Sequence, residues 1–115
     1  MKVLALFGSP RPGGFSSRMH ELFLSGLGDL PVTRFQIVDL DIHPCTACGI
    51  CRDPGGCPFR DDMDGLYDRM READLIVISS PVYFSSLPSA LKAVIDRCQL
   101  FWDLREKGRL ESELR

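Results

Sequence analysis

The sequence KVLALF at residues 2–7 is a continuous apolar run that stops abruptly at Gly8, Ser9 and Pro10. A run of this length without alternation is typical of a β-strand buried on both faces, as strands are in parallel sheets. The stretch LIVIS at residues 75–79 has the same character and is the most strand-like part of the chain. Two such strands need covering layers on both faces of a sheet, which favours a layered α/β architecture.

The segments between these strands carry helix and strand patterns in alternation. Apolar residues recur at helical spacing in three segments, and one further segment is rich in β-branched and aromatic residues. We expect helices over about 16–27, over about 62–72 and from 87 onward, and a strand over 32–38. The resulting order, β-α-β-loop-α-β-α, predicts an α/β fold with a parallel, doubly wound sheet. Ligands of such sheets lie beyond the carboxyl ends of the strands.

The chain has 115 residues and a net charge of -2. This length suits one domain, and the lack of a basic excess argues against a nucleic-acid partner. The amino-terminal apolar run is too short for the core of a secretion signal and far too short to cross a bilayer. We therefore expect a cytoplasmic protein that binds neither nucleic acid nor membrane. In a reducing compartment, clustered cysteines are more often metal ligands or redox thiols than structural disulfides.

The loop GSPRPGGFSS at residues 8–17 joins the first buried strand to a helix. The free N–H groups and the dipole of a helix N-terminus favour an anion, and glycines let it approach the backbone. The hydroxyl groups of Ser9, Ser16 and Ser17 and the charge of Arg11 suit a monophosphate. The Walker A lysine and the Gly-x-Gly-x-x-Gly spacing are both missing, which argues against a triphosphate or a dinucleotide. The alternative is a Gly/Pro turn in which a serine caps the helix.

A second candidate loop, at 80–88, follows the strand that we expect to be the most buried one. It contains Pro81, Val82, Tyr83 and Phe84. Two aromatic residues at the carboxyl edge of a sheet are suited to stack on a flat ring. The alternative is that both aromatic rings simply cover the core.

Four of the five cysteines fall within a short loop, as Cys45, Cys48, Cys51 and Cys57. The first three repeat at every third residue, a spacing that wraps a chain around a compact metal centre, as in bacterial ferredoxins. Glycines in this loop leave N–H groups free to donate to sulfide. Two alternatives remain open. One is a zinc site, in which His43 is a further possible ligand, and the other is a set of free or reversibly oxidised thiols.

The remaining polar residues are explained by structure rather than by catalysis. Asp61 and Asp62 precede an expected helix, where capping accounts for both carboxylates. Arg97 lies where a charge forms a surface or helix-end pair, and His20 has no obvious nucleophile as a partner. Cys98 falls on the apolar face of its helix and is expected to be buried. We therefore assign no catalytic acid, base or nucleophile.

Three stretches together carry a family resemblance: GSPR-x2-G-x-SS after the first strand, CPFRDDM before a helix, and EADLIVISSPVYFSSLPSALKAVIDR. The sequence resembles the flavodoxin-like NADPH-dependent FMN reductase family, most specifically over residues 81–97. The spacing C-x2-C-x2-C-x5-C is similar to that of its iron–sulfur flavoprotein branch. Phe15 departs from the pattern, since many relatives have a small polar residue there, and one phosphate donor is lost.

The resemblance implies two cofactors and their binding residues. It implies that FMN is bound through its phosphate by Ser9, Arg11, Ser16 and Ser17, and that its ring is bordered by Pro81, Val82, Tyr83 and Phe84. It also implies that Cys45, Cys48, Cys51 and Cys57 hold a [4Fe-4S] cluster. Together these features indicate an FMN-dependent oxidoreductase that transfers electrons, with NAD(P)H or a ferredoxin-type protein as donor. FMN itself or a quinone is the expected acceptor if the cluster is absent.

The chain is shorter than the family pattern, which continues with two more strands and helices. We expect residues 1–115 to form a single flavodoxin-like domain with a Cys-rich loop at 43–60, shortened after the third strand and its helix. The strand within 72–80 then has an open apolar edge, for which a homo-oligomer is the expected cover. An alternative function follows from the same shortening: a non-enzymatic module that binds zinc or an iron–sulfur cluster and has no flavin.

Overall fold

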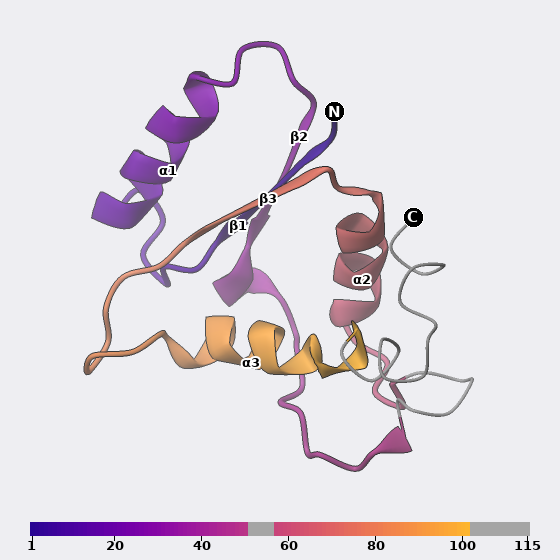
Figure 1. Cartoon of the computed structure of the whole chain (residues 1–115). Coiled ribbons are helices and arrows are strands. Elements are labelled where there is room, and N and C mark those ends of the chain that lie inside the picture. Colours follow the sequence, from indigo (N-terminus) through magenta and orange to yellow (C-terminus); the bar gives the residue numbers. More distant parts are fainter. Residues whose placement is uncertain (51–56, 102–115) are drawn as a thin grey trace. The chain divides into compact units, whose positions relative to one another are not determined.

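The computed structural model describes residues 1–50 and 57–101 of the chain (Figure 1). Its elements follow in the order β1 (Val3–Phe7), α1 (Phe15–Ser25), β2 (Val32–Gln36), the 3-10 helix η1 (Ile37–Asp39), α2 (Met63–Glu72), β3 (Leu75–Ser79) and α3 (Ser89–Arg97). The chain divides into two compact units. The first holds Met1–Leu40 and Ala73–Lys92, and the second holds Asp41–Glu72 and the chain from Ala93 onward.

Three parallel strands form the sheet of the first unit in the order β2-β1-β3. Phe7 at the end of β1 lies opposite Gln36 of β2 and Ser79 of β3, so the three strands end together. The Gly8 N–H donates to the Ser79 carbonyl oxygen over 2.9 Å. A Cβ atom at Gly8 would lie 2.5 Å from that oxygen and 2.7 Å from Leu91 Cδ2, so this close approach requires glycine. The predicted parallel α/β sheet is confirmed.

One face of the sheet packs against α1. Val3, Ala5 and Phe7 of β1 form a buried cluster with Leu24 of α1. Five partly buried residues surround this cluster: Leu27, Leu30, Val32, Leu75 and Val77. Full burial of a Val, Leu or Phe side chain stabilises a fold by about 1.5–3 kcal/mol. This cluster fixes α1 against the sheet, and with it the loop that precedes the helix (Figure 1).

The other face is covered unevenly. Leu4 and Leu6 of β1 are buried, but their neighbours on β3, Ile76 and Ile78, are 42% and 48% exposed. The expectation that β3 is the most buried strand is therefore wrong, and β1 holds that place because it has a strand on each side. The expected open edge is present, since β3 is the last strand of the sheet in the described part of the chain.

The second strand and the first helix are shorter than expected. β2 ends at Gln36, opposite the last residue of β1, because no strand remains beyond that point to pair with it. The chain turns instead into η1, in which the Leu40 N–H donates to the Ile37 carbonyl oxygen. At the end of α1, the Gly26 N–H donates to the Phe23 carbonyl oxygen, which tightens the last turn into 3-10 geometry.

The second unit contains α2 and the end of α3. Met63, Leu66 and Tyr67 form the buried face of α2. Asp61 caps this helix, since its Oδ1 accepts a hydrogen bond from the Met63 N–H at 3.0 Å. The Tyr67 hydroxyl donates to the Arg97 carbonyl oxygen at 2.6 Å, which ties α2 to the end of α3. Helix capping by this pair of aspartates was predicted from the sequence, and it is observed for Asp61.

Candidate functional site

The first candidate loop is held by hydrogen bonds within the loop and by one from β2. The Arg11 N–H donates to Ser9 Oγ at 3.1 Å, and the Gly14 N–H donates to the Arg11 carbonyl oxygen at 3.1 Å. The Gln36 amide donates to the Ser9 carbonyl oxygen at 2.9 Å. Gly13 has a φ of 75°, which favours glycine, and nothing lies within 4 Å of the place where its Cβ would be. The loop therefore has internal hydrogen bonds and leaves open space above Gly13.

The N-terminus of α1 has free donors of the kind that bind anions. Gly14 is the N-cap residue and no side chain caps the helix, so the predicted alternative of a serine cap is wrong. The first N–H groups of a helix have no partner within it. Ser17 Oγ is buried and has no hydrogen-bond partner in the described part of the chain. Ser16 is half-buried and Arg11 is exposed. These donors fit the phosphate of FMN in their chemistry.

The second candidate loop presents its aromatic residues to solvent. Tyr83 and Ser86 exchange two backbone hydrogen bonds of 2.9 Å each, which close a tight turn. Phe84 and Ser85 at the tip have φ angles of 48° and 63°. Phe84 is fully exposed and Val82 is 78% exposed. The alternative that the aromatic rings of this loop cover the core is therefore wrong, and their faces are available to a planar ligand.

The two loops leave neighbouring strand ends in the first unit. β1 and β3 end side by side at Phe7 and Ser79, so loop 8–17 and loop 80–88 start at the same edge of the sheet (Figure 1). A parallel sheet places both loops where ligands of doubly wound folds bind. The sequence predicted this placement from the order of the elements alone.

A buried histidine, His20, lies beneath this edge of the sheet. His20 Nδ1 of α1 lies 2.7 Å from Ser79 Oγ, and its ring stacks on Phe7 with 4.1 Å between ring centroids. His20 Nε2 is buried without a hydrogen-bond partner in the described residues. Burial lowers the pKa of His20 below its ordinary value. The imidazole is therefore neutral at neutral pH, and it links α1 to the end of β3.

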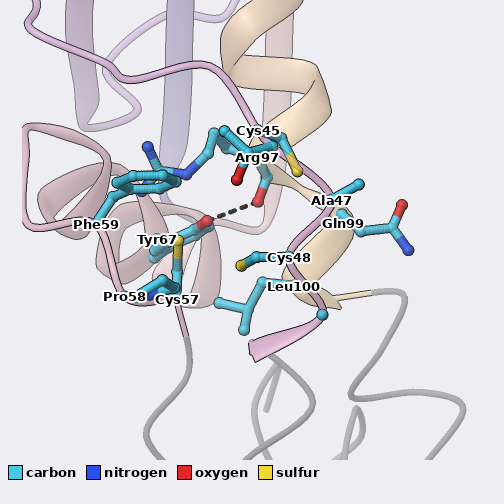
Figure 2. A pocket seen from close by; sticks show the side chains of 12 residues that line it. Cys45, Ala47, Cys48, Cys57, Pro58, Phe59, Tyr67, Arg97, Gln99 and Leu100 are labelled. Atoms are coloured by element: carbon cyan, nitrogen blue, oxygen red, sulfur yellow. Dashed lines mark hydrogen bonds between the residues drawn. The ribbon is translucent and has the colours of Figure 1, made fainter.

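The cysteine loop lies in the second unit. Cys45 and Cys48 are exposed, Cys57 is half-buried, and all three line one pocket with Tyr67 and Arg97 (Figure 2). The described residues contain no group of three histidine, cysteine or acidic side chains arranged to hold a metal ion. The fourth predicted ligand, Cys51, lies outside the described residues. The thiol donors suit an iron–sulfur cluster chemically, and three of the four share one pocket.

The two ends of this loop meet at a buried ion pair. Arg97 Nη1 donates to Asp61 Oδ2 at 2.7 Å and to the His43 carbonyl oxygen at 2.8 Å, and Nη2 lies 3.3 Å from Asp61 Oδ1. The His43 N–H donates to Asp61 Oδ2 at 2.8 Å. The rings of His43 and Phe59 stack with centroids 3.9 Å apart, and the Arg97 guanidinium lies 5.4 Å from the Phe59 centroid. The loop is thus fastened at both ends by side chains of its own unit.

Asp61, Arg97 and Tyr67 shift one another's pKa values. Burial would raise the pKa of Asp61, but hydrogen bonds from Arg97, His43 N–H and Met63 N–H hold the pKa below its ordinary value. Burial would likewise lower the pKa of Arg97, but Asp61 and Tyr67 raise it overall. Burial raises the pKa of Tyr67 to about 12, so its hydroxyl remains a donor. Asp61 and Arg97 are therefore both charged at neutral pH.

The sequence predicted a surface or helix-end pair for Arg97; the helix-end pair is observed, with Asp61, but it is buried and not at the surface. The residue is 2% exposed. The signal for burial was its spacing, because Leu91, Val94 and Arg97 recur at every third position and all three are buried. Cys98 is half-buried, with its Sγ 3.9 Å from Met70 Sδ. Burial raises the pKa of the Cys98 thiol, in keeping with its expected role in packing.

Comparison with known proteins shows which family the chain belongs to. The sequence matches the NADPH-dependent FMN reductase family over residues 1–112. The chain belongs to this family. Within it, the chain is 37% identical over 99 residues to an iron–sulfur flavoprotein of Methanocaldococcus jannaschii, which covers 84% of this chain and 51% of that protein. It is also 37% identical over 113 residues to an iron–sulfur flavoprotein of Methanosarcina thermophila, which covers 94% of this chain and 56% of that protein.

The FMN reductase fold is supported by a solved structure as well. The apo form of a NADH:FMN oxidoreductase superposes with a TM-score of 0.58 at 21% identity, over 84% of this chain and 49% of that one. The flavodoxin-like α/β fold and the iron–sulfur flavoprotein branch, both expected from the resemblance, are confirmed. The chain spans about half the length of the curated relatives that it matches. In the described residues, no helix is long and apolar enough to span a membrane.

Proposed function

We propose that this chain is an FMN-dependent oxidoreductase that transfers electrons. Its donor is NAD(P)H or a ferredoxin-type protein, and if the chain holds no cluster, its acceptor is FMN or a quinone. The observation that carries the proposal is the pair of loops at one edge of the sheet, one with open anion donors and one with exposed aromatic rings. Membership of the FMN reductase family supports the same cofactor.

The first loop would hold the flavin phosphate. The N–H groups at the start of α1 and the unpartnered hydroxyl of Ser17 are donors for phosphate oxygens. Ser16 and Arg11 would add a hydroxyl and a positive charge at the outer side. Ser9 acts differently, because its hydroxyl accepts from the Arg11 N–H and so shapes the loop. We therefore assign Ser17, rather than Ser9, the larger share of direct phosphate binding.

The second loop would border the flavin ring. Pro81, Val82, Tyr83 and Phe84 carry the exposed apolar surface that a planar ring requires. The tight turn closed by Tyr83 and Ser86 fixes the backbone beneath those side chains. When bound, FMN would supply the redox chemistry, which is hydride acceptance from NAD(P)H and electron transfer to the acceptor. The residues of the chain bind and orient the flavin and exclude water from its ring.

The cysteine loop would hold a [4Fe-4S] cluster through Cys45, Cys48, Cys51 and Cys57. The shared pocket of three of these residues supports this assignment, as do the names of the related iron–sulfur flavoproteins. When bound, such a cluster carries one electron at a time. The loop would then relay single electrons between the flavin and an external partner.

A second candidate function is a metal-binding module without a flavin. The observation that favours it is the division of the chain into two units. The cysteine pocket lies entirely in the second unit, and the two rim loops, residues 8–17 and 80–88 at the edge of the sheet, lie in the first. Metal binding by the cysteines, with zinc or an iron–sulfur cluster, therefore does not depend on flavin binding.

Anaerobic purification separates the two functions. The purified chain is analysed for FMN, iron, sulfide and zinc, and its visible spectrum is recorded. FMN together with four irons and four sulfides per chain supports the oxidoreductase. A colourless protein with one zinc and no affinity for added FMN contradicts it and supports the metal-binding module. The variant Cys48→Ala tests the ligand assignment, with Cys98→Ala as the control, since only the former should lose iron.

We also propose that the chain forms a homo-oligomer through β3. The strand lies at the edge of the sheet within the described residues, and Ile76 and Ile78 expose apolar surface beside that edge. Open apolar edges tend to pair with another chain. The variant Ile78→Lys should shift the protein toward the monomer in sedimentation analysis. A wild-type chain that sediments as a monomer at high concentration would contradict the proposal.

A further inference from the structure

Arg97 is a charged residue buried in the interior of the second unit. It is the last residue of α3 and is 2% exposed. An arginine in the interior is costly unless it is paired and hydrogen-bonded. Replacing a whole buried ion pair with apolar residues is often neutral or stabilising, whereas removing one partner alone is strongly destabilising. Stability alone therefore does not explain Arg97, and its partners indicate what it does.

The partners of Arg97 are the two ends of the cysteine loop. His43, which gives its carbonyl oxygen, stands two residues before Cys45. Asp61, which gives both carboxylate oxygens, stands four residues after Cys57. The same carboxylate also accepts the His43 N–H. One guanidinium thus joins His43, before the first cysteine, to Asp61, after the last one. Closing a loop in advance removes an entropic cost from ligand binding.

Part of the guanidinium remains unused. Arg97 Nε is buried and has no hydrogen-bond partner in the described part of the chain. A buried donor without a partner costs about 1–3 kcal/mol, and such groups are rare unless a ligand or an ion completes them. Arg97 lines the same pocket as Cys45, Cys48 and Cys57 (Figure 2). Sulfur anions in that pocket are acceptors for such a donor, and hydrogen bonds to cluster sulfurs change the reduction potential.

We propose that Arg97 is a positioning residue of the cysteine site. Its Nη groups hold His43 and Asp61 together at the base of the loop, and its Nε–H is a donor for the anionic sulfur group held by the cysteines. The second part rests on the proposed [4Fe-4S] cluster. The first part does not, because the closed base is a property of the metal-free chain.

The metal-free chain tests the closure at the base. Hydrogen exchange of the His43 amide reports it directly, since this N–H donates to Asp61. The Gly8 amide, which donates to Ser79 in the first unit, is the internal reference. In Arg97→Met, the His43 amide should exchange at least about tenfold faster, because a loss of 1.4 kcal/mol in local opening is a factor of ten. The Gly8 amide should keep its wild-type rate.

Two further variants keep this test decisive. Arg97→Lys retains the positive charge but not the planar guanidinium, which binds a carboxylate through two N–H groups. The His43 amide should therefore exchange faster than in the wild type and more slowly than in Arg97→Met. Arg60→Met is the control, since it removes an exposed arginine of the same unit, which pairs with Asp64 and not with Asp61 in the described residues. If Arg97→Met does not fold, Arg97→Lys and Asp61→Asn are judged by the same His43-to-Gly8 ratio. A His43 amide that exchanges at the wild-type rate in these variants overturns the closure.

The loaded chain tests the Nε donor. Ferrous iron and sulfide are added anaerobically, and the midpoint potential of the bound cluster is measured by redox titration. In Arg97→Met and Arg97→Lys the potential should shift to a more negative value, because a donor that favours the reduced cluster is lost. An unchanged potential in both variants overturns this part of the proposal. If the wild type binds no iron, the proposed cluster fails, while the His43 exchange ratio still decides the closure.

Discussion

Arg97 and Asp61 form a buried, bidentate ion pair, with 2.7 Å between Nη1 and Oδ2 and 3.3 Å between Nη2 and Oδ1. Their side chains are 1% and 6% exposed. The pair does three things at once: it neutralises a buried charge, caps α2 through the Met63 N–H, and closes the base of the cysteine loop at His43. A change at either residue therefore affects the fold and the candidate metal site together.

The first prediction concerns the stability provided by Asp61. Asp61→Asn leaves Arg97 charged, buried and without its anion, so the free energy of unfolding should fall by about 3 kcal/mol. The pKa of Asp61 is lower in the folded chain than its ordinary value. Its contribution is therefore present above the unfolded pKa of about 4 and is lost as the pH falls below it. Urea unfolding at several pH values should show the two proteins converging in acid. A constant difference down to about pH 3 would contradict this account.

The second prediction concerns Tyr67, whose hydroxyl donates to the Arg97 carbonyl oxygen. Tyr67→Phe should cost about 1 kcal/mol, the usual contribution of one hydrogen bond. The pKa of Tyr67 is raised to about 12, so the hydroxyl stabilises the fold below pH about 10, and this contribution is lost as the pH rises toward 12. Subtracting the phenolate titration of Tyr67→Phe from that of the wild type isolates the transition. A midpoint near 10 would show that the hydroxyl is not buried.

The third prediction compares two glycines. In Gly8→Ala the new Cβ would meet the Ser79 carbonyl oxygen at 2.5 Å and Leu91 Cδ2 at 2.7 Å, so the variant should lose about 1–3 kcal/mol of stability. Gly65 lies inside α2 with nothing within 4 Å of its Cβ position. Gly65→Ala should gain about 0.5–1 kcal/mol, because alanine favours helices. Thermal unfolding of both variants measures the contrast. Equal effects would show that the β1 and β3 ends are not this close.

The fourth prediction concerns the neutral histidine beneath the edge of the sheet. Burial lowers the pKa of His20 in the folded chain, so its contribution to stability is present above about pH 6.5 and is lost as the pH falls. His20→Asn cannot gain this proton, so its stability should change less between about pH 7.5 and 5. Unfolding curves at the two pH values provide the comparison, and the NMR titration of His20 gives its pKa. A His20 pKa above 6.5 would reverse the expected sign.

The sequence was sufficient to predict the order of the elements and the location of both rim loops. Unbroken apolar runs at 3–7 and 75–79 mark strands regardless of context, and the loops must follow those strands in a parallel sheet. It was not sufficient to predict which strand is central. That depends on the order β2-β1-β3, which is set by contacts far apart in the chain. The exposure of Ile76 and Ile78 follows from that order.

The cysteine motif was recognisable from its spacing in the sequence. The side chains that hold the two ends of its loop together were not. Arg97, Asp61 and His43 are 54 residues apart at most, and only the folded second unit brings them within hydrogen-bond distance. Asp61 was correctly predicted to be a helix cap, because capping is a local pattern. Its second partner, Arg97, is remote in sequence, and a charged residue is normally placed at the surface. Site residues that act by holding a loop leave little local signal.

The fifth prediction separates the two roles that serines have in the first loop. Ser17 Oγ has no hydrogen-bond partner in the described residues, so Ser17→Ala should leave stability almost unchanged and weaken FMN binding about tenfold. Ser25 Oγ bonds the Leu22 carbonyl oxygen at the far end of the same helix, and Ser25→Ala is the control that should not alter FMN binding. Fluorescence titration of free FMN measures both affinities.

A third variant completes this comparison. Ser9 Oγ accepts the Arg11 N–H, so Ser9→Ala loosens the loop and should weaken FMN binding together with a loss of stability of about 1 kcal/mol. Ser17→Ala should thus weaken FMN binding without lowering stability. Ser9→Ala should weaken FMN binding and lower stability, and Ser25→Ala should do neither. If Ser17→Ala binds FMN as tightly as the wild type, the buried hydroxyl is not a phosphate donor. The phosphate would then have to be held by the N–H groups at the start of α1 alone.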